Sequence, residues 1–176
     1  MQRLILVLLT LLLAAGTAQA SWAQQHLSRA WSGGLTNPEV DELTAGLDEL
    51  DLKKSDDAWS VILLAIHFDA RGQLQRSCPL VARFDGMKKW RNELRLNALR
   101  GACLLQEGDV GGAAKAARAS ARKAAMTEPA DFTGILLRAH EVHGVAMVGQ
   151  LKAKPDDGAV RSQTKKALVA WETAAR

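Results

Sequence analysis

Apolar residues within residues 90–126 recur at helical spacing on both sides of one polar turn. Before the turn they mostly lie three to five residues apart, as along one face of a helix, and charged side chains occupy the outer positions. The apolar positions are Leu94, Leu96, Leu99, Cys103 and Leu104, with Ala98 and Ala102 between them. Gly108 supplies the left-handed residue that commonly ends a helix, and Asp109 follows as an N-cap. The pattern predicts two antiparallel helices joined at Gly108-Asp109.

The second of these helices is rich in alanine, which favours helix formation intrinsically. Its alanines are Ala113, Ala114, Ala116, Ala117, Ala119, Ala121, Ala124 and Ala125, and the outer positions carry Lys115, Arg118, Arg122 and Lys123. Such a helix is thin, so that neighbouring helices can approach it closely. We therefore interpret the small residues as a packing surface and not as a catalytic one.

The same apolar spacing and the same start and stop signals divide the rest of the chain into further helices. They are expected over residues 21–31, from a cap at Asn37, over residues 55–70, between Leu74 and Phe84, from Pro129 to about Leu151, and from about Val160 to Trp171. No segment carries a strand or β-hairpin pattern. The sequence predicts an all-α fold of seven or eight helices in one domain, residues 21–176.

The hairpin of residues 90–126 resembles the tetratricopeptide repeat. The matching positions are Gly101, Leu104, Gly108-Asp109, Ala113 and Ala117, whereas Ser120 replaces the usual Ala and Pro129 comes later than the closing Pro of the family. Residues 58–85 resemble it less clearly, through Ala65, Phe68, Gly72 and Ser77. Gly108 follows Gly72 by 36 residues, near the repeat period of 34. The resemblance implies antiparallel helical hairpins in a stack, and a closed helical bundle remains the alternative.

The first twenty residues have the form of a secretory signal peptide. Arg3 gives a positive start, an apolar run from Leu4 to Ala15 follows, and Ala18-Gln19-Ala20 forms a small-x-small cleavage site. Cleavage would leave a periplasmic or secreted protein with no stable membrane anchor, starting at Ser21. The alternative is an uncleaved N-terminal anchor, which the short apolar run disfavours.

Two cysteines, Cys78 and Cys103, are present. The repeat resemblance places Cys78 in the second helix of one hairpin and Cys103 in the first helix of the next, and such helices are neighbours in a stack. Because export leads to an oxidising compartment, we expect a disulfide between them. Two buried thiols are the alternative.

Charge is distributed unevenly along the chain, whose formal net charge is +4. Acidic residues concentrate between Glu39 and Asp57, and basic residues concentrate between Arg83 and Lys123. Helix caps and solvent-exposed helix faces explain the acidic residues better than a paired-carboxylate hydrolase site does. This arrangement predicts a dipolar surface that steers an oppositely charged partner, unless the two regions face each other within the fold. The expected partner contacts are Lys88, Lys89, an exposed Trp90, Arg91 and Arg95. So small a basic excess in an exported protein argues against a nucleic-acid partner.

His140 and His143 are the strongest candidates for chemistry, because residues three apart share one helix face and two imidazoles could begin a metal site. No third ligand is signalled nearby, so two surface or partly buried histidines are the alternative reading. The patterns HExxH, CxxCH and GxSxG are absent, and the chain contains no Tyr. We therefore expect no catalytic residue and no cofactor.

Together these observations predict a non-enzymatic, exported protein-binding module that acts by surface recognition. One alternative is a periplasmic immunity or inhibitor protein that blocks a toxin or hydrolase. A small metal-binding protein or hydrolase that uses His140 and His143 is a further alternative.

Overall fold

The computed structural model describes residues 22–176. The predicted signal peptide, residues 1–20, and its cleavage point lie outside the described residues. Within the described part, none of the helices combines the length and the apolarity that a membrane crossing requires.

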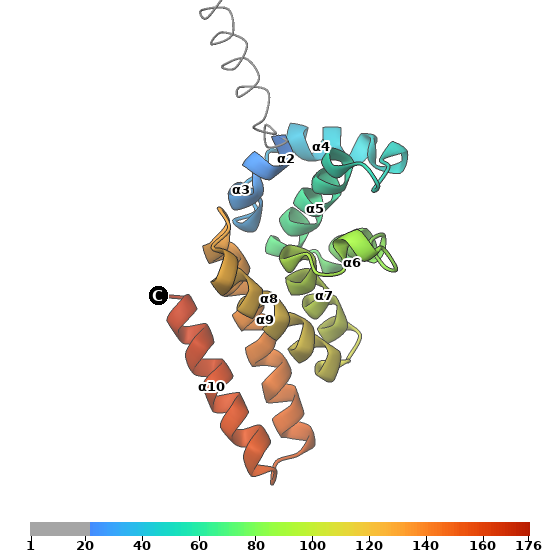
Figure 1. Cartoon of the computed structure of the whole chain (residues 1–176). Helices are drawn as coiled ribbons and strands as arrows, with labels where there is room; N and C mark the ends of the chain where they lie inside the picture. The colour runs from blue at the N-terminus through green and yellow to red at the C-terminus, as the bar shows by residue number, and fades with distance from the viewer. Residues whose placement is uncertain (1–21) are drawn as a thin grey trace, which may run out of the picture.

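The described residues form α-helices and short 3₁₀ turns and contain no strand, so the predicted all-α class is confirmed (Figure 1). The α-helices are α2 (Trp22–Gln25), α3 (Leu27–Trp31), α4 (Asn37–Ala45), α5 (Ser55–Ala70), α6 (Leu74–Ala82), α7 (Leu94–Gln106), α8 (Val110–Thr127), α9 (Phe132–Ala153) and α10 (Gly158–Ala174). The 3₁₀ turns are η1 (Leu47–Glu49) and η2 (Lys88–Trp90).

Consecutive helices pair as the antiparallel hairpins α5/α6, α7/α8 and α9/α10 (Figure 1). Helix α8 packs against both α7 and α9, and α10 lies along α9 at the C-terminal end of the stack. Helices α2, α3 and α4 pack against α5 at the other end. The arrangement is a stack of helical hairpins, within which α9 has neighbours on several sides.

The turns between paired helices follow from local signals in the sequence. Gly72 and Gly108 both adopt positive φ, +70° and +84°, which confirms their expected role at the helix ends. The carboxylate of Asp109 accepts the N–H of Gly112 at 2.8 Å, which confirms Asp109 as the N-cap of α8.

Two predicted helix starts are wrong by a few residues. Helix α7 begins at Leu94 and not at position 90, because the carboxylate of Glu93 accepts the N–H of Arg95 and caps the helix there. In α4 the N-cap is Thr36 and not Asn37, because the N–H and hydroxyl of Thr36 both donate to Glu39.

The largest core cluster forms around α5, which is buried from Val61 to Asp69. The C-terminal half has smaller clusters built on alanines, which lets its helices lie close together. Gly101 of α7 shows how close: a Cβ built there would lie 2.9 Å from Cγ1 of Val142 in α9 and 3.3 Å from the carbonyl oxygen of Ala113 in α8.

Buried hydroxyl groups tie the two helices of each hairpin together. Ser77 donates to the carbonyl of Ala65 at 2.8 Å, and Ser120 donates to that of Leu94 at 2.7 Å. In the third hairpin, the hydroxyl of Thr164 lies 3.1 Å from the carbonyl oxygen of Met147. The serines that depart from the repeat pattern therefore have a structural reason, since each satisfies a backbone acceptor of the partner helix.

The cysteine pairing expected from the repeat alignment is confirmed. Cys78 of α6 and Cys103 of α7 form a disulfide, with their Cα atoms 5.6 Å apart. The bond joins the α5/α6 hairpin to the α7/α8 hairpin, so it restrains the position of one hairpin relative to the next.

Candidate functional site

Of the five expected partner contacts, Lys88, Lys89 and Arg91 are exposed, but Trp90 is not. Only 5% of Trp90 is accessible, so the expectation of an exposed aromatic is wrong. Its indole N–H donates to the carbonyl of Leu52 at 3.2 Å, and its ring meets those of Trp59 and Phe84 edge-on. Trp90 is therefore a core residue that anchors the loop between α6 and α7.

Arg95 is also buried, and all three nitrogens of its guanidinium donate hydrogen bonds within the fold. Its Nε donates to Oδ2 of Asp131 at 2.8 Å, its Nη2 donates to Oδ1 of the same carboxylate, and its Nη1 donates to Glu93 at 2.8 Å. The indole N–H of Trp31 donates to Asp131 as well. Arg95 is therefore buried in a structural ion pair, and its position does not support the expectation that it contacts a partner.

A second bidentate ion pair joins α9 to α5. Nε and Nη2 of Arg138 donate to the two carboxylate oxygens of Asp69 at 2.8 and 2.6 Å, and Nη1 donates to Glu141. Burial raises the pKa of Asp69, against the attraction of Arg138. The sequence carries no local signal for this pair, whose members are 69 residues apart.

A concave surface lies between α8 and α10, with α9 at its base. Two adjoining hollows of about 620 and 450 Å³ share Arg118, Arg122, His143 and Gln163. Their remaining lining consists of Ala114, Lys115, Ala119, Ala121 and Ala125 from α8, Leu136, His140, Met147 and Gln150 from α9, and Lys166, Ala167 and Ala170 from α10. We call this surface the α8–α10 groove.

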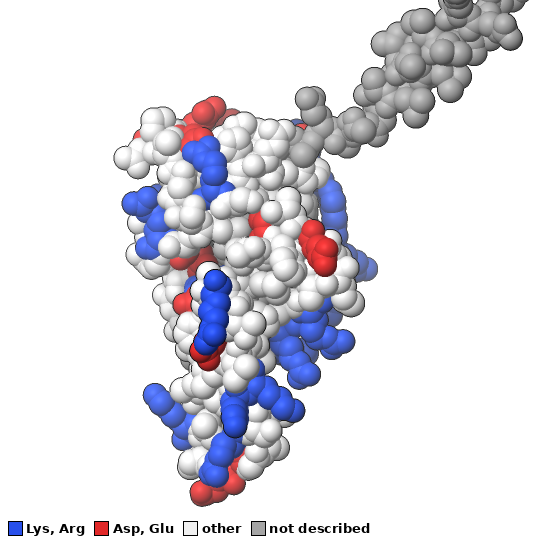
Figure 2. Space-filling model, turned by 90° about the vertical axis from the view of Figure 1, so that its left-hand side faces the viewer, with Lys and Arg blue, Asp and Glu red and all other residues white. Residues whose placement is uncertain are grey.

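The rims of the α8–α10 groove are basic. Lys115, Arg118 and Arg122 line it from α8 and Lys166 from α10, and all four are exposed. Within residues 22–176, none of the four makes an ion pair, and no Asp or Glu lines the groove. Figure 2 shows one face of the molecule, on which lysine and arginine side chains are spread over both halves, with several at the level of the C-terminal helices. The groove is therefore suited to anionic groups.

His140 and His143 both line this groove, so they lie on the same side of α9, as expected from their spacing. Burial lowers the pKa of both, and the charge of Arg118 lowers that of His143 further. Both shifts of pKa favour the neutral imidazole. Residues 22–176 contain no group of three or more His, Cys, Asp or Glu side chains placed to hold a metal ion, so the two histidines lack a third ligand there.

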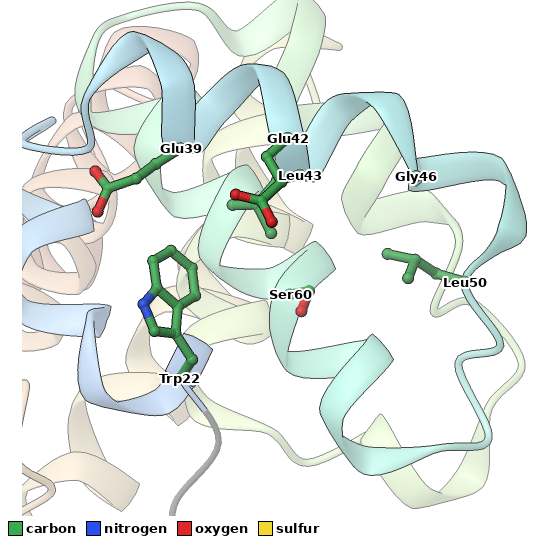
Figure 3. Close-up of a pocket in the computed structure, with 7 residues that line it drawn as sticks. All are labelled: Trp22, Glu39, Glu42, Leu43, Gly46, Leu50 and Ser60. Carbon is green, nitrogen blue, oxygen red and sulfur yellow. The ribbon is translucent and has the colours of Figure 1, made fainter.

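A separate hollow, of about 490 Å³, lies at the N-terminal end of the stack between α2, α4 and α5 (Figure 3). It is lined by Trp22, Glu39, Glu42, Leu43, Gly46, Leu50 and Ser60. Figure 3 shows the indole of Trp22 rising toward α4, from which Glu42 and Leu43 project. This hollow is acidic and aromatic, in contrast to the α8–α10 groove.

Glu39 is held in place at the edge of this hollow. It accepts two hydrogen bonds from Arg29 at 3.0 Å, together with those from Thr36. These hydrogen bonds, the one from Arg29 first, lower its pKa from 4.5 to about 2. Glu39 is thus a structural carboxylate, whereas Glu42 makes no ion pair within residues 22–176.

The acidic and basic regions of the chain meet only in part: Arg83, at the start of the basic region, donates to the carbonyls of Leu47 and Leu50 within the acidic region. Helix α4 packs against α5 at one end of the stack, whereas α8 packs between α7 and α9 (Figure 1). The carboxylates of α4 and the cations of α8 therefore lie on separate parts of the molecule.

Comparisons with protein-family models, curated proteins and solved structures find no match to this chain.

Proposed function

We propose that this chain is an exported, non-enzymatic protein-binding module of tetratricopeptide-like type, which acts by surface recognition. The observation that carries the proposal is the α8–α10 groove, whose small apolar side chains lie between rims of cations that are unpaired within residues 22–176. A groove of this kind offers contact area and charge to another macromolecule, and paired helices hold its walls in place.

Two features support the tetratricopeptide-like part of the proposal. The turn glycines Gly72 and Gly108, 36 residues apart, share the left-handed conformation. Gly101 occupies the tight contact among α7, α8 and α9 that a small residue at this repeat position would make. Both observations agree with a repeating hairpin of nearly the family's period.

Export is supported by the N-terminal sequence and by the disulfide. The first twenty residues have the charge, apolar run and cleavage pattern of a signal peptide. A disulfide between Cys78 and Cys103 is compatible with an oxidising compartment, where such bonds persist.

The test is capture of a partner by the tagged chain of residues 21–176 from its native envelope extract, at low salt, with identification by mass spectrometry. We expect one partner in stoichiometric amount, because a recognition module has a defined ligand. A toxin or hydrolase among the captured proteins would favour the immunity or inhibitor alternative over a scaffold. Capture of no stoichiometric partner would contradict the proposal.

A further inference from the structure

The α8–α10 groove is long enough to hold several turns of a helix. The lining residues of α8 run from Ala114 to Ala125, which corresponds to a rise of about 16 Å, or three helical turns. Ala121, Ala167 and Ala170 are among the small residues of the lining. Because these side chains are short, the backbone of a second helix can approach closely, and an apolar stripe on that helix would cover them.

The positive charges at the rims of the groove indicate which charge the polar face of such a helix should carry. Lys115, Arg118 and Arg122 are three and four residues apart, so they form one row along α8, and Lys166 lines the groove from α10. No carboxylate lines the groove, and none of these cations forms an ion pair within residues 22–176. The ligand that complements both features carries an apolar stripe flanked by carboxylates.

We propose that the α8–α10 groove binds an acidic amphipathic helix of a partner protein. The apolar stripe of the helix packs on the alanines, and its carboxylates pair with the row on α8 and with Lys166. This inference rests on the proposed protein-binding function and names the chemistry of the partner. A flat anionic membrane fits the groove less well, because it would reach the cationic rims and leave the hollow between them unfilled.

The test uses the oxidised chain of residues 21–176 and a displayed library of random peptides of about fourteen residues, long enough for almost four helical turns. Selected peptides are synthesised and their affinities measured by fluorescence anisotropy. We expect them to carry Asp or Glu beside apolar residues at helical spacing. The double variant Arg118→Glu, Arg122→Glu should bind them at least about tenfold more weakly, because two attractive contacts become repulsive.

A matched control separates the groove from net charge. Lys53→Glu, Lys54→Glu makes the same change in charge at exposed positions before α5, and it should leave the affinity within about twofold. Peptides whose acidic residues are replaced by Lys should regain binding to the Arg118→Glu, Arg122→Glu variant. This rescue also shows that the variant is folded.

Several outcomes would overturn the groove assignment. The selected peptides could lack acidic residues, or both double variants could weaken peptide binding equally. The chain could bind phosphatidylglycerol vesicles in place of peptides, in a way that depends on Arg118 and Arg122. It could also self-associate, with the Arg118→Glu, Arg122→Glu variant abolishing the association. If a partner captured from the extract binds both variants as tightly as the unmodified chain, the groove assignment fails and the protein-binding function stands. If neither the extract nor the library yields a ligand, both fail.

Discussion

Loss of the disulfide between Cys78 and Cys103 should lower the free energy of unfolding by about 3.5 kcal/mol. The bond closes a loop over a sequence separation of 25 residues, and restriction of such a loop in the unfolded chain gives a stabilisation of about this size. For a domain of this length, that difference corresponds to a fall in melting temperature of about 7–14 °C.

The assay is urea unfolding of residues 21–176, followed by tryptophan fluorescence. Trp59 and Trp90 lie in or against the main core, so their emission should report its exposure to water. The oxidised chain is compared with the same chain in dithiothreitol and with Cys78→Ala, Cys103→Ala. Reductant should have no effect on the double variant, which controls for any action of dithiothreitol on the rest of the protein.

A difference below about 1 kcal/mol between the oxidised and reduced chains would refute the reasoning. It would mean that the unfolded chain already holds these two segments near each other, so that the covalent bond removes little freedom. Two free thiols in the protein purified without reductant, detected by mass spectrometry, would refute the disulfide itself.

Three further changes test the packing and the ion pairs. Asp131→Ala should cost about 3–5 kcal/mol in urea unfolding, because it leaves the buried guanidinium of Arg95 without its bidentate partner. Gly101→Val should cost about 1–3 kcal/mol, because even a Cβ there meets Val142 at 2.9 Å; an equally stable variant would show that α7 and α9 separate easily. Glu39, whose pKa is lowered from 4.5 to about 2, contributes stability that is present above about pH 4.5 and lost as the pH falls toward 2. Glu39→Gln should therefore flatten the decline of melting temperature over that range, and an unchanged decline would contradict this assignment.

The elements of the fold could be predicted because their signals are local. Helical spacing of apolar residues, a glycine with positive φ and a capping carboxylate act within a few residues of one another, as at Gly108 and Asp109. The disulfide could be predicted because the repeat register brought Cys78 and Cys103 onto neighbouring helices, although they are far apart in sequence.

The expected exposure of Trp90 failed because burial depends on tertiary contacts. Its neighbours Lys88, Lys89 and Arg91 are exposed, and a charged environment in the sequence favours a surface position. In the short turn η2, however, one side chain points inward while its neighbours face solvent, and the indole reaches the ring of Trp59 from a different helix. Nothing within the local sequence specifies that contact.

The groove could be predicted only in part, for a similar reason. The basic row on α8 is visible as Lys115, Arg118 and Arg122 in the sequence, but Lys166 lies far along the chain. It joins them only because α8 and α10 both pack along α9. The histidines reach the same groove because α9 forms its base.

Some cations of this protein form ion pairs that stabilise the fold, whereas others are free to bind a partner. Arg95 and Arg138 are each matched by a carboxylate in bidentate geometry, and each joins helices from distant parts of the chain. Arg118 and Arg122 have no such partner within residues 22–176, although acidic residues are present on α4. Neither net charge nor sequence position distinguishes the paired arginines from the unpaired ones. The difference arises because only some arginines meet a carboxylate from a distant part of the chain. Charge reversal at Arg118 and Arg122 should therefore alter binding with little effect on stability, whereas removal of Asp131 should do the reverse.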